Sequence, residues 1–219
     1  MQRIRHPDNR SLSLFYETYY FGYPVQKDYI PYISEYLNKT KNIIETTTNE
    51  YSRVFAFRVD LRFPSGTYLQ IFDGNTVIER FVSSLKAKIR HNRDRAKESN
   101  PYAHDTIVRY VWCREIGKEG SVHYHFAILL NNDAFCTLGK FEMDRDNLFN
   151  RMHEAWASAL RISSSDAIGL VHFPENPFYQ LRKNDSQSIS DFFYRVSYLS
   201  KAATKLFGNN AHSFGASRV

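Results

Sequence analysis

The chain has 219 residues, of which 42% are apolar and 16% aromatic, so we expect one folded core plus an extension and exclude a disordered chain. Its 29 Lys and Arg outnumber its 23 Asp and Glu, and the net charge of +6 favours a polyanionic partner. The two distant cysteines, Cys113 and Cys136, exclude a zinc ribbon, argue against a disulfide framework and favour a reducing compartment. Because the N-terminus lacks a signal peptide and no apolar run approaches the ~20 residues of a membrane span, we expect a soluble cytoplasmic protein with no membrane contact.

Residues 1–50 are expected to form an N-terminal extension that is helical and packs on the main domain. Its first half is rich in aromatic residues, and apolar residues recur at close to helical spacing over residues 30–44. A small DNA-contacting arm is the alternative, because Lys27, Lys39 and Lys41 permit it without requiring it.

The main domain, residues 51–219, is expected to open with a strand over residues 53–63. Side chains alternate between the two faces of a strand. One face is uniformly apolar, and it carries Phe55, Phe57, Val59, Leu61 and Phe63. The other face carries Val54, Ala56, Arg58, Asp60 and Arg62. The pattern predicts one face in a core and one polar face.

A helix is predicted over residues 77–97, where apolar residues recur at helical spacing. Its second half is the densest basic stretch of the chain and includes Lys86, Lys88, Arg90, Arg93, Arg95 and Lys97. These cations suit either a solvated helix face or a surface that contacts a phosphate backbone, and both interpretations stay open.

Two further strands are predicted over residues 106–115 and 122–130, joined as a hairpin through residues 117–120. His123 and His125 lie two apart, so they share a face and are separated by about 7 Å along the strand. Neutral imidazole is the commonest metal-ligating side chain. The pair can therefore bind one ion, or can be two hydrogen-bonded histidines on a half-exposed strand. If the hairpin forms, Glu115 lies beside His123 and adds a carboxylate to the two imidazoles.

The last third of the chain is predicted to hold a helix over residues 144–160, a short strand over 167–173, a loop over 179–190 and a final helix over 191–207. The final helix contains Tyr194-x-x-x-Tyr198-x-x-Lys201, whose three named side chains share one helix face. A tyrosine pair on a helix usually packs in a core or an interface. A lysine beside two tyrosine hydroxyls can instead lower the cost of phenolate formation or neutralise a phosphate.

The elements predict an α+β fold, with a central antiparallel sheet and helices packed mainly on one face. His123-Tyr124-His125 within an apolar strand resembles the histidine–hydrophobic–histidine motif of the HUH endonucleases, whose catalytic domain has a ferredoxin-like or RRM-like sheet. The tyrosine–lysine spacing of residues 194–201 is similar to a motif of their two-tyrosine rolling-circle replication initiators. More narrowly, the chain resembles inovirus-type and prophage-encoded replication proteins.

The resemblance implies a metal-dependent nuclease domain over residues 51–219 that nicks and joins single-stranded DNA to initiate rolling-circle replication of a phage, prophage or plasmid. It implies that His123, His125 and Glu115 hold one Mg²⁺ or Mn²⁺ ion. Tyr194 and Tyr198 would be alternating nucleophiles that form a 5′-phosphotyrosyl intermediate. The remaining implied roles are phosphate positioning by Lys201 and strand binding by Lys86, Lys88, Arg90, Arg93, Arg95 and Lys97.

The implied partners are a single-stranded DNA origin, a host polymerase and a host helicase, because the chain contains no phosphate-loop motif of its own. Three alternatives stay open. The chain could be a transposase or relaxase of the same superfamily, a non-catalytic nucleic-acid-binding module, or a structural zinc-binding or interaction protein. The last would need a fourth ligand that the sequence does not offer.

Overall fold

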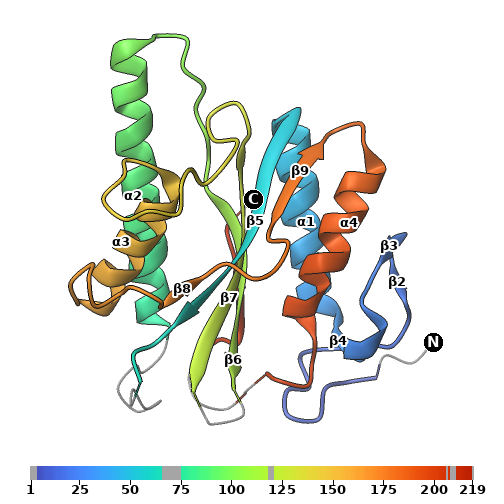
Figure 1. Cartoon of the computed structure of the whole chain (residues 1–219). Helices are drawn as coiled ribbons and strands as arrows, with labels where there is room; N and C mark the ends of the chain where they lie inside the picture. The colour runs from blue at the N-terminus through green and yellow to red at the C-terminus, as the bar shows by residue number, and fades with distance from the viewer. Residues whose placement is uncertain (1–3, 66–74, 118–120, 206, 208–210, 219) are drawn as a thin grey trace.

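The computed structural model describes residues 4–65, 75–117, 121–205, 207 and 211–218. Within these ranges the chain is an α+β structure in which a six-stranded antiparallel sheet lies between two pairs of helices (Figure 1). No helix in these ranges is long and apolar enough to cross a membrane.

The sheet places one strand, β7, between two long neighbours. Its strands are, in spatial order, β10 (Phe214–Ala216), β6 (Arg109–Ile116), β7 (Val122–Asn131), β5 (Arg53–Arg62) and β8 (Val171–His172), with β9 (Phe178–Arg182) pairing the other end of β5. β7 therefore has a full-length partner on each side, and its backbone groups are hydrogen-bonded along both edges.

The helices α2 (Thr76–Ser99) and α3 (Leu148–Leu160) cover one face of the sheet, and they bury its large side chains. Phe57 and Phe126 from the strands meet Phe81 of α2 and Trp156 of α3 in this core. The indole of Trp156 is fully buried, and its Nε1 donates to the Arg62 carbonyl at 2.7 Å, which satisfies its polar atom.

The helices α1 (Ser34–Glu50) and α4 (Ser186–Ser197) cover the opposite face. The prediction that helices pack mainly on one face is therefore wrong, as is the prediction of a polar face for β5. Small side chains, Val54 and Ala56 of β5 and Ala127 of β7, let these helices approach the sheet closely and form a second core. The two charged residues farther along this face of β5, Arg58 and Asp60, are also buried.

The α+β class and most predicted elements of the middle of the chain are confirmed. The strands predicted over residues 53–63, 106–115 and 122–130 are β5, β6 and β7, and the helices predicted over 77–97 and 144–160 are α2 and α3. Strong apolar periodicity marks each of them. The predicted hairpin connection includes residues 118–120, which lie outside the described residues.

The predicted C-terminal helix is wrong at both ends. α4 begins at Ser186, because the Asp185 side chain accepts from two backbone amides of its first turn, and β9 occupies part of the predicted loop. The chain leaves the helix at Tyr198, runs through one 3₁₀ turn (Tyr198–Ser200) and pairs with Tyr32 at Lys201 as an isolated β-bridge. The tyrosines and the lysine are therefore not on one continuous helix.

The extension is helical only in its second half, α1. Before it lie short strands, β1 (Leu14–Phe15), β2 (Tyr19–Tyr20), β3 (Tyr23–Pro24) and β4 (Tyr32–Ile33), with a 3₁₀ turn at Lys27–Tyr29 between β3 and β4. The expectation that the extension as a whole is helical is therefore wrong for this aromatic-rich stretch, because β-prone aromatic residues and prolines dominate it. The division of the chain at residue 50 stays a prediction.

One turn in this segment has an unusual backbone. The two-residue connection between β2 and β3 is Phe21-Gly22, with φ of 48° and 86°. A hairpin turn with both central φ angles positive favours Asn followed by Gly, and a bulky side chain in this region is strained.

We expect Phe21→Asn to stabilise the fold by about 1 kcal/mol, because Asn tolerates this conformation and Phe21 is mostly exposed. Urea unfolding of the variant against wild type measures the change. Phe21→Ala, which keeps a Cβ and lacks the amide of Asn, is the matched control. Equal or lower stability for Phe21→Asn than for Phe21→Ala would contradict the assignment of strain.

Candidate metal centre

The register of three strands brings together side chains that are distant in sequence. On the β6–β7 pair Glu115 lies opposite His123, and on the β5–β7 pair Asp60 lies opposite His125. All four belong to the alternation that faces α1 and α4, because they share their strand faces with Ala56 and Ala127. The sheet therefore assembles the three predicted ligands and adds a second carboxylate.

The three predicted ligands, Glu115, His123 and His125, can hold a metal ion. Each offers one ligand atom, and these atoms all lie within 4.8 Å of one another. Burial, and then the neighbouring His125, lower the pKa of His123 and so favour the neutral imidazole that binds metals. The arrangement supplies two nitrogen donors and one oxygen donor on one side of a site.

Asp60 fixes the tautomer of His125. Asp60 Oδ1 lies 2.5 Å from His125 Nδ1, and Arg58 Nη2 lies 3.1 Å from the same oxygen. Arg58 Nη2 also comes within 3.3 Å of Nδ1, but the shorter partner of Nδ1 is a carboxylate that can only accept, so Nδ1 carries the proton. Burial raises the pKa of Asp60, but the hydrogen bond and charge of His125, joined by Arg58, lower it overall, so the carboxylate stays ionised.

The other nitrogen of His125 is left facing an anion. Nε2 is buried and has no hydrogen-bond partner among the described residues, and it lies 3.4 Å from Glu115 Oε2. In the neutral imidazole, which is the form that binds metals, Nδ1 keeps the proton and Nε2 presents a lone pair, so two acceptors then face each other in a buried environment. A cation between them removes the repulsion, and a carboxylate–histidine–metal arrangement has this geometry. The residues therefore fit a divalent ion.

Glu115 is also the centre of an ion-pair network. Lys201 Nζ lies 3.0 Å from Oε2 and Lys205 Nζ lies 2.8 Å from Oε1, and both lysine side chains are buried. Tyr198 Oη donates to Oε2 at 3.3 Å. Burial raises the pKa of Glu115, but His125 and Lys205 hold it well below its ordinary value. Because one carboxylate faces two lysines, the cluster has a cationic excess, which suits an anionic phosphate.

The structure brings Tyr198 but not Tyr194 into this cluster. The Tyr198 ring lies 5.5 Å from the His125 ring, and Lys201 Nζ sits 3.5 Å from the Tyr198 ring centroid. Burial, then the charge of Glu115, raise the pKa of Tyr198 above its ordinary value. The Tyr194 side chain is 46% exposed and lines a separate cavity of about 330 Å³ together with Tyr19.

The six predicted strand-binding cations lie on α2, on the opposite face of the sheet from the metal cluster. Three of them are engaged in ion pairs: Lys88 with Glu154 at 2.6 Å, Arg95 with Asp146 at 3.6 Å, and Lys97 with Asp105 at 2.6 Å. A fourth, Arg93, stacks on the Phe135 ring at 4.5 Å.

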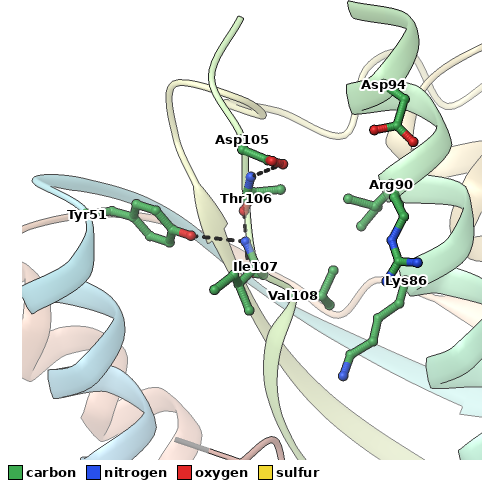
Figure 2. Close-up of a pocket in the computed structure, with 9 residues that line it drawn as sticks. Tyr51, Lys86, Arg90, Asp94, Asp105, Thr106, Ile107 and Val108 are labelled. Carbon is green, nitrogen blue, oxygen red and sulfur yellow. Dashed lines mark hydrogen bonds between the residues drawn. The ribbon is translucent and has the colours of Figure 1, made fainter. Parts of the chain in front are cut away.

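The remaining two cations, Lys86 and Arg90, form no ion pair within the described part of the chain. They line a cavity of about 530 Å³ between α2 and the segment that leads into β6. Figure 2 shows this cavity, with the Tyr51 hydroxyl accepting from the Ile107 amide at 3.0 Å on its opposite wall. These two cations therefore lie across the sheet from the triad.

No role was expected from the sequence for four residues near the centre: Arg58, Asp60, Lys205 and His172. The alternation Arg58-Val59-Asp60 within an apolar strand is a signal that was available, since buried charges occur in pairs. Lys205 is a second lysine four residues after Lys201, but its ion pair with Glu115 depends on the turn after α4, which the sequence does not reveal. His172 is half-exposed, and its Nδ1 lies 3.8 Å from Asp60 Oδ2 at the edge of the cluster.

Comparison with known proteins places the chain in a family. The family model of the YagK/YfjJ C-terminal domain matches residues 17–217. YagK of Escherichia coli strain K12 is 36% identical over 197 residues, which cover 86% of this chain and 94% of YagK. YfjJ of the same strain is 34% identical over 198 residues, which cover 85% of this chain and 95% of YfjJ. No solved structure matches the chain significantly. The chain belongs to the YagK/YfjJ family.

We expect wild-type protein to bind one Mn²⁺ in titration calorimetry and His125→Ala to lose this binding. Asp60→Asn should weaken it by about 10- to 100-fold, because residues that orient a ligating histidine have effects of this size. His172→Ala is the matched control, since it removes a histidine beside Asp60 but outside the triad. Unchanged Mn²⁺ binding in His125→Ala would rule out the site.

Lys205→Met should destabilise the protein by about 3 kcal/mol, because it breaks a buried ion pair and leaves Glu115 undercompensated. Lys88→Met is the control. Its ion pair with Glu154 has a similar length but is partly exposed, so we expect a loss of about 1 kcal/mol or less. Urea unfolding measures both changes. Equal losses of stability in the two variants would contradict a buried ion pair between Lys205 and Glu115.

Proposed function

We propose that this member of the YagK/YfjJ family is a metal-dependent endonuclease of the HUH type, which nicks and rejoins single-stranded DNA through a tyrosine nucleophile. The observation that carries the proposal is the position of Tyr198, whose hydroxyl contacts Glu115 within a triad that fits a metal ion. A nucleophile, a triad that fits a metal ion and buried cations in one cluster are a combination that can catalyse phosphodiester transfer.

His123, His125 and Glu115 would hold the ion, and Asp60 would orient His125 from behind. When bound, a divalent ion such as Mg²⁺ or Mn²⁺ supplies a Lewis acid that stabilises charge on the scissile phosphate. Two imidazoles and a carboxylate also suit other first-row divalent metals, so selection between ions depends on what the cell supplies.

In the proposed step the Tyr198 hydroxyl oxygen attacks the phosphorus of a single-stranded phosphodiester. The new bond from tyrosine oxygen to phosphorus forms as the bond from phosphorus to the 3′ oxygen breaks. The phenolic proton is lost to solvent, and the departing 3′ oxygen takes up a proton. The products are a 5′-phosphotyrosyl link and a free 3′-OH, and attack by a 3′-OH on the link reverses the step and rejoins the strand.

The neighbouring cations serve the phosphate and the nucleophile. Lys201 lies against both the Tyr198 ring and Glu115, so it can neutralise a phosphate that Tyr198 attacks. The Arg58 guanidinium carbon lies 5.7 Å from the centroid of the same ring and adds positive charge near it. We assign the first attack to Tyr198, and Tyr194 would act as a second nucleophile only after a movement that brings it in from its outer cavity.

The biological role that we propose is initiation of rolling-circle replication of a phage, prophage or plasmid, with host helicase and polymerase extending the freed 3′-OH. A transposase or relaxase would use the same chemistry. A non-catalytic DNA-binding module is the competing function, and it requires neither the tyrosine nor the metal. DNA that extends beyond the centre could reach Lys86 and Arg90 on the other side of the sheet.

The proposal is tested with a labelled pool of single-stranded oligonucleotides of randomised sequence, which contains any cleavage site. With Mn²⁺, wild-type protein should form a covalent DNA adduct on a denaturing gel. Tyr198→Phe removes only the nucleophilic hydroxyl and should abolish the adduct, and His125→Ala should abolish it through loss of the ion. Tyr194→Phe is the matched control and should still form the adduct in a single cut.

An adduct that persists in Tyr198→Phe and disappears in Tyr194→Phe would contradict the assignment of the nucleophile. DNA binding without an adduct in wild-type protein, for every divalent metal tested, would contradict the enzyme and favour the binding module.

A further inference from the structure

Exposed aromatic side chains gather on the N-terminal segment and the end of α4. Among the described residues, Tyr19 and Phe21 of the β2–β3 hairpin are 61% and 77% exposed. Tyr29 and Tyr194 are also exposed. We call these four residues the aromatic surface. Figure 1 shows β2 and β3 beside the end of α4, away from the helices α2 and α3.

Phe21 is held outward at an energetic cost. Its φ of 48° is a conformation that bulky residues rarely adopt, and the turn would be less strained with Asn or Gly at this position. Its ring contacts the Tyr20 ring at 4.9 Å, and Lys41 Nζ lies 5.7 Å from it, but most of the side chain remains in solvent. A strained, exposed aromatic residue is a candidate for a binding function, because these contacts leave most of its surface unused.

The part of the aromatic surface formed by Tyr19, Tyr29 and Tyr194 adjoins the candidate metal centre, whereas Phe21 lines a neighbouring cavity. Tyr19 and Tyr194 both line a cavity of about 330 Å³ that Lys27 also lines. Next to it, the Tyr29 ring meets the Tyr198 ring edge-on at 4.8 Å, and Lys201 Nζ lies 5.4 Å from the Tyr29 ring. The turn Lys27–Tyr29 therefore links the cavity, which Lys27 lines, to the proposed nucleophile, which Tyr29 contacts.

The segment is fixed in place rather than loosely attached. Gln26 Nε2 donates to the carbonyls of Tyr194 and Arg195 at 2.9 and 3.1 Å, and the buried Tyr32 donates its hydroxyl to the Gln26 carbonyl at 2.6 Å. These bonds hold the turn that carries Tyr29 against the end of α4. The rings are thus preorganised, and a ligand would not need to order them.

We propose that the aromatic surface is a stacking platform for the unpaired bases of the single strand that enters the centre. This inference rests on the proposed function and adds the element that holds the substrate. Aromatic rings stack on any base, and the exposed Lys27, which lines the same cavity, supplies a cation for the backbone. Asp28 also lines the cavity, so attraction of phosphates alone does not explain the surface.

The test is fluorescence anisotropy of a labelled oligothymidylate in EDTA, where no cleavage takes place. Tyr19→Ala and Phe21→Ala should each weaken binding by about tenfold, which corresponds to the loss of one stacked base. Tyr102→Ala is the matched control, because Tyr102 is an exposed aromatic residue in the turn after α2, and its affinity should equal that of wild type. Phe21→Trp keeps a stacking ring and should retain wild-type affinity. An abasic oligonucleotide of equal length should bind wild type and variants equally weakly.

Equal affinity of wild type, Tyr19→Ala and Phe21→Ala for oligothymidylate would overturn the platform, as would wild-type affinity for the abasic strand equal to that for oligothymidylate. Thermal melting of each variant confirms that a loss of binding is not a loss of fold. The outcome is independent of cleavage. If wild-type protein forms an adduct in Mn²⁺ but Tyr19→Ala and Phe21→Ala bind oligothymidylate as wild type does, only the platform is contradicted. If these variants weaken base-dependent binding but wild-type protein forms no adduct, only the proposed nuclease is contradicted.

Discussion

The hydrogen bond from His125 Nδ1 to Asp60 determines the chemistry of this centre. It exists because β5 and β7 pair with these two residues directly opposite each other. In the neutral imidazole it leaves the other nitrogen with a lone pair toward Glu115, which β6 supplies from the far side of β7. A register slip of one residue on any of the three strands would turn its side chain to the opposite face. The apolar cores on both faces of the sheet hold that register, so the fold specifies the site.

The same centre joins the sheet to the end of α4. Glu115 forms ion pairs with Lys201 and Lys205, both of which lie after the point where the chain leaves the helix. Removing these charges from water is costly, and only a nearly complete set of partners offsets that cost. The turn that delivers Tyr198 is therefore fixed by the electrostatics of the centre as well as by packing. This coupling explains why the proposed nucleophile lies at a helix end, where the chain can bend toward the ligands.

Much of the fold was predictable from periodicity alone. The alternation around His123 and the helical spacing on α2 identify their elements, and the hairpin logic places Glu115 beside His123. The end of α4 was not predictable, because the apolar spacing continues past Tyr198 while tertiary contacts of Lys201 end the helix. The position of Asp60 depends on which strand pairs with β7, and one sequence does not reveal long-range pairing. The strained turn at Phe21 contradicts local preference, as residues held for binding commonly do.

A crystal structure of the protein soaked in Mn²⁺, with diffraction collected at the manganese absorption edge, tests the central claim most directly. The account predicts one anomalous peak bounded by Glu115, His123 and His125 Nε2, with Asp60 still bonded to Nδ1. A peak elsewhere, or Lys201 and Lys205 enclosing Glu115 with no peak at the triad, would contradict it and leave the cluster as a purely structural ion-pair network.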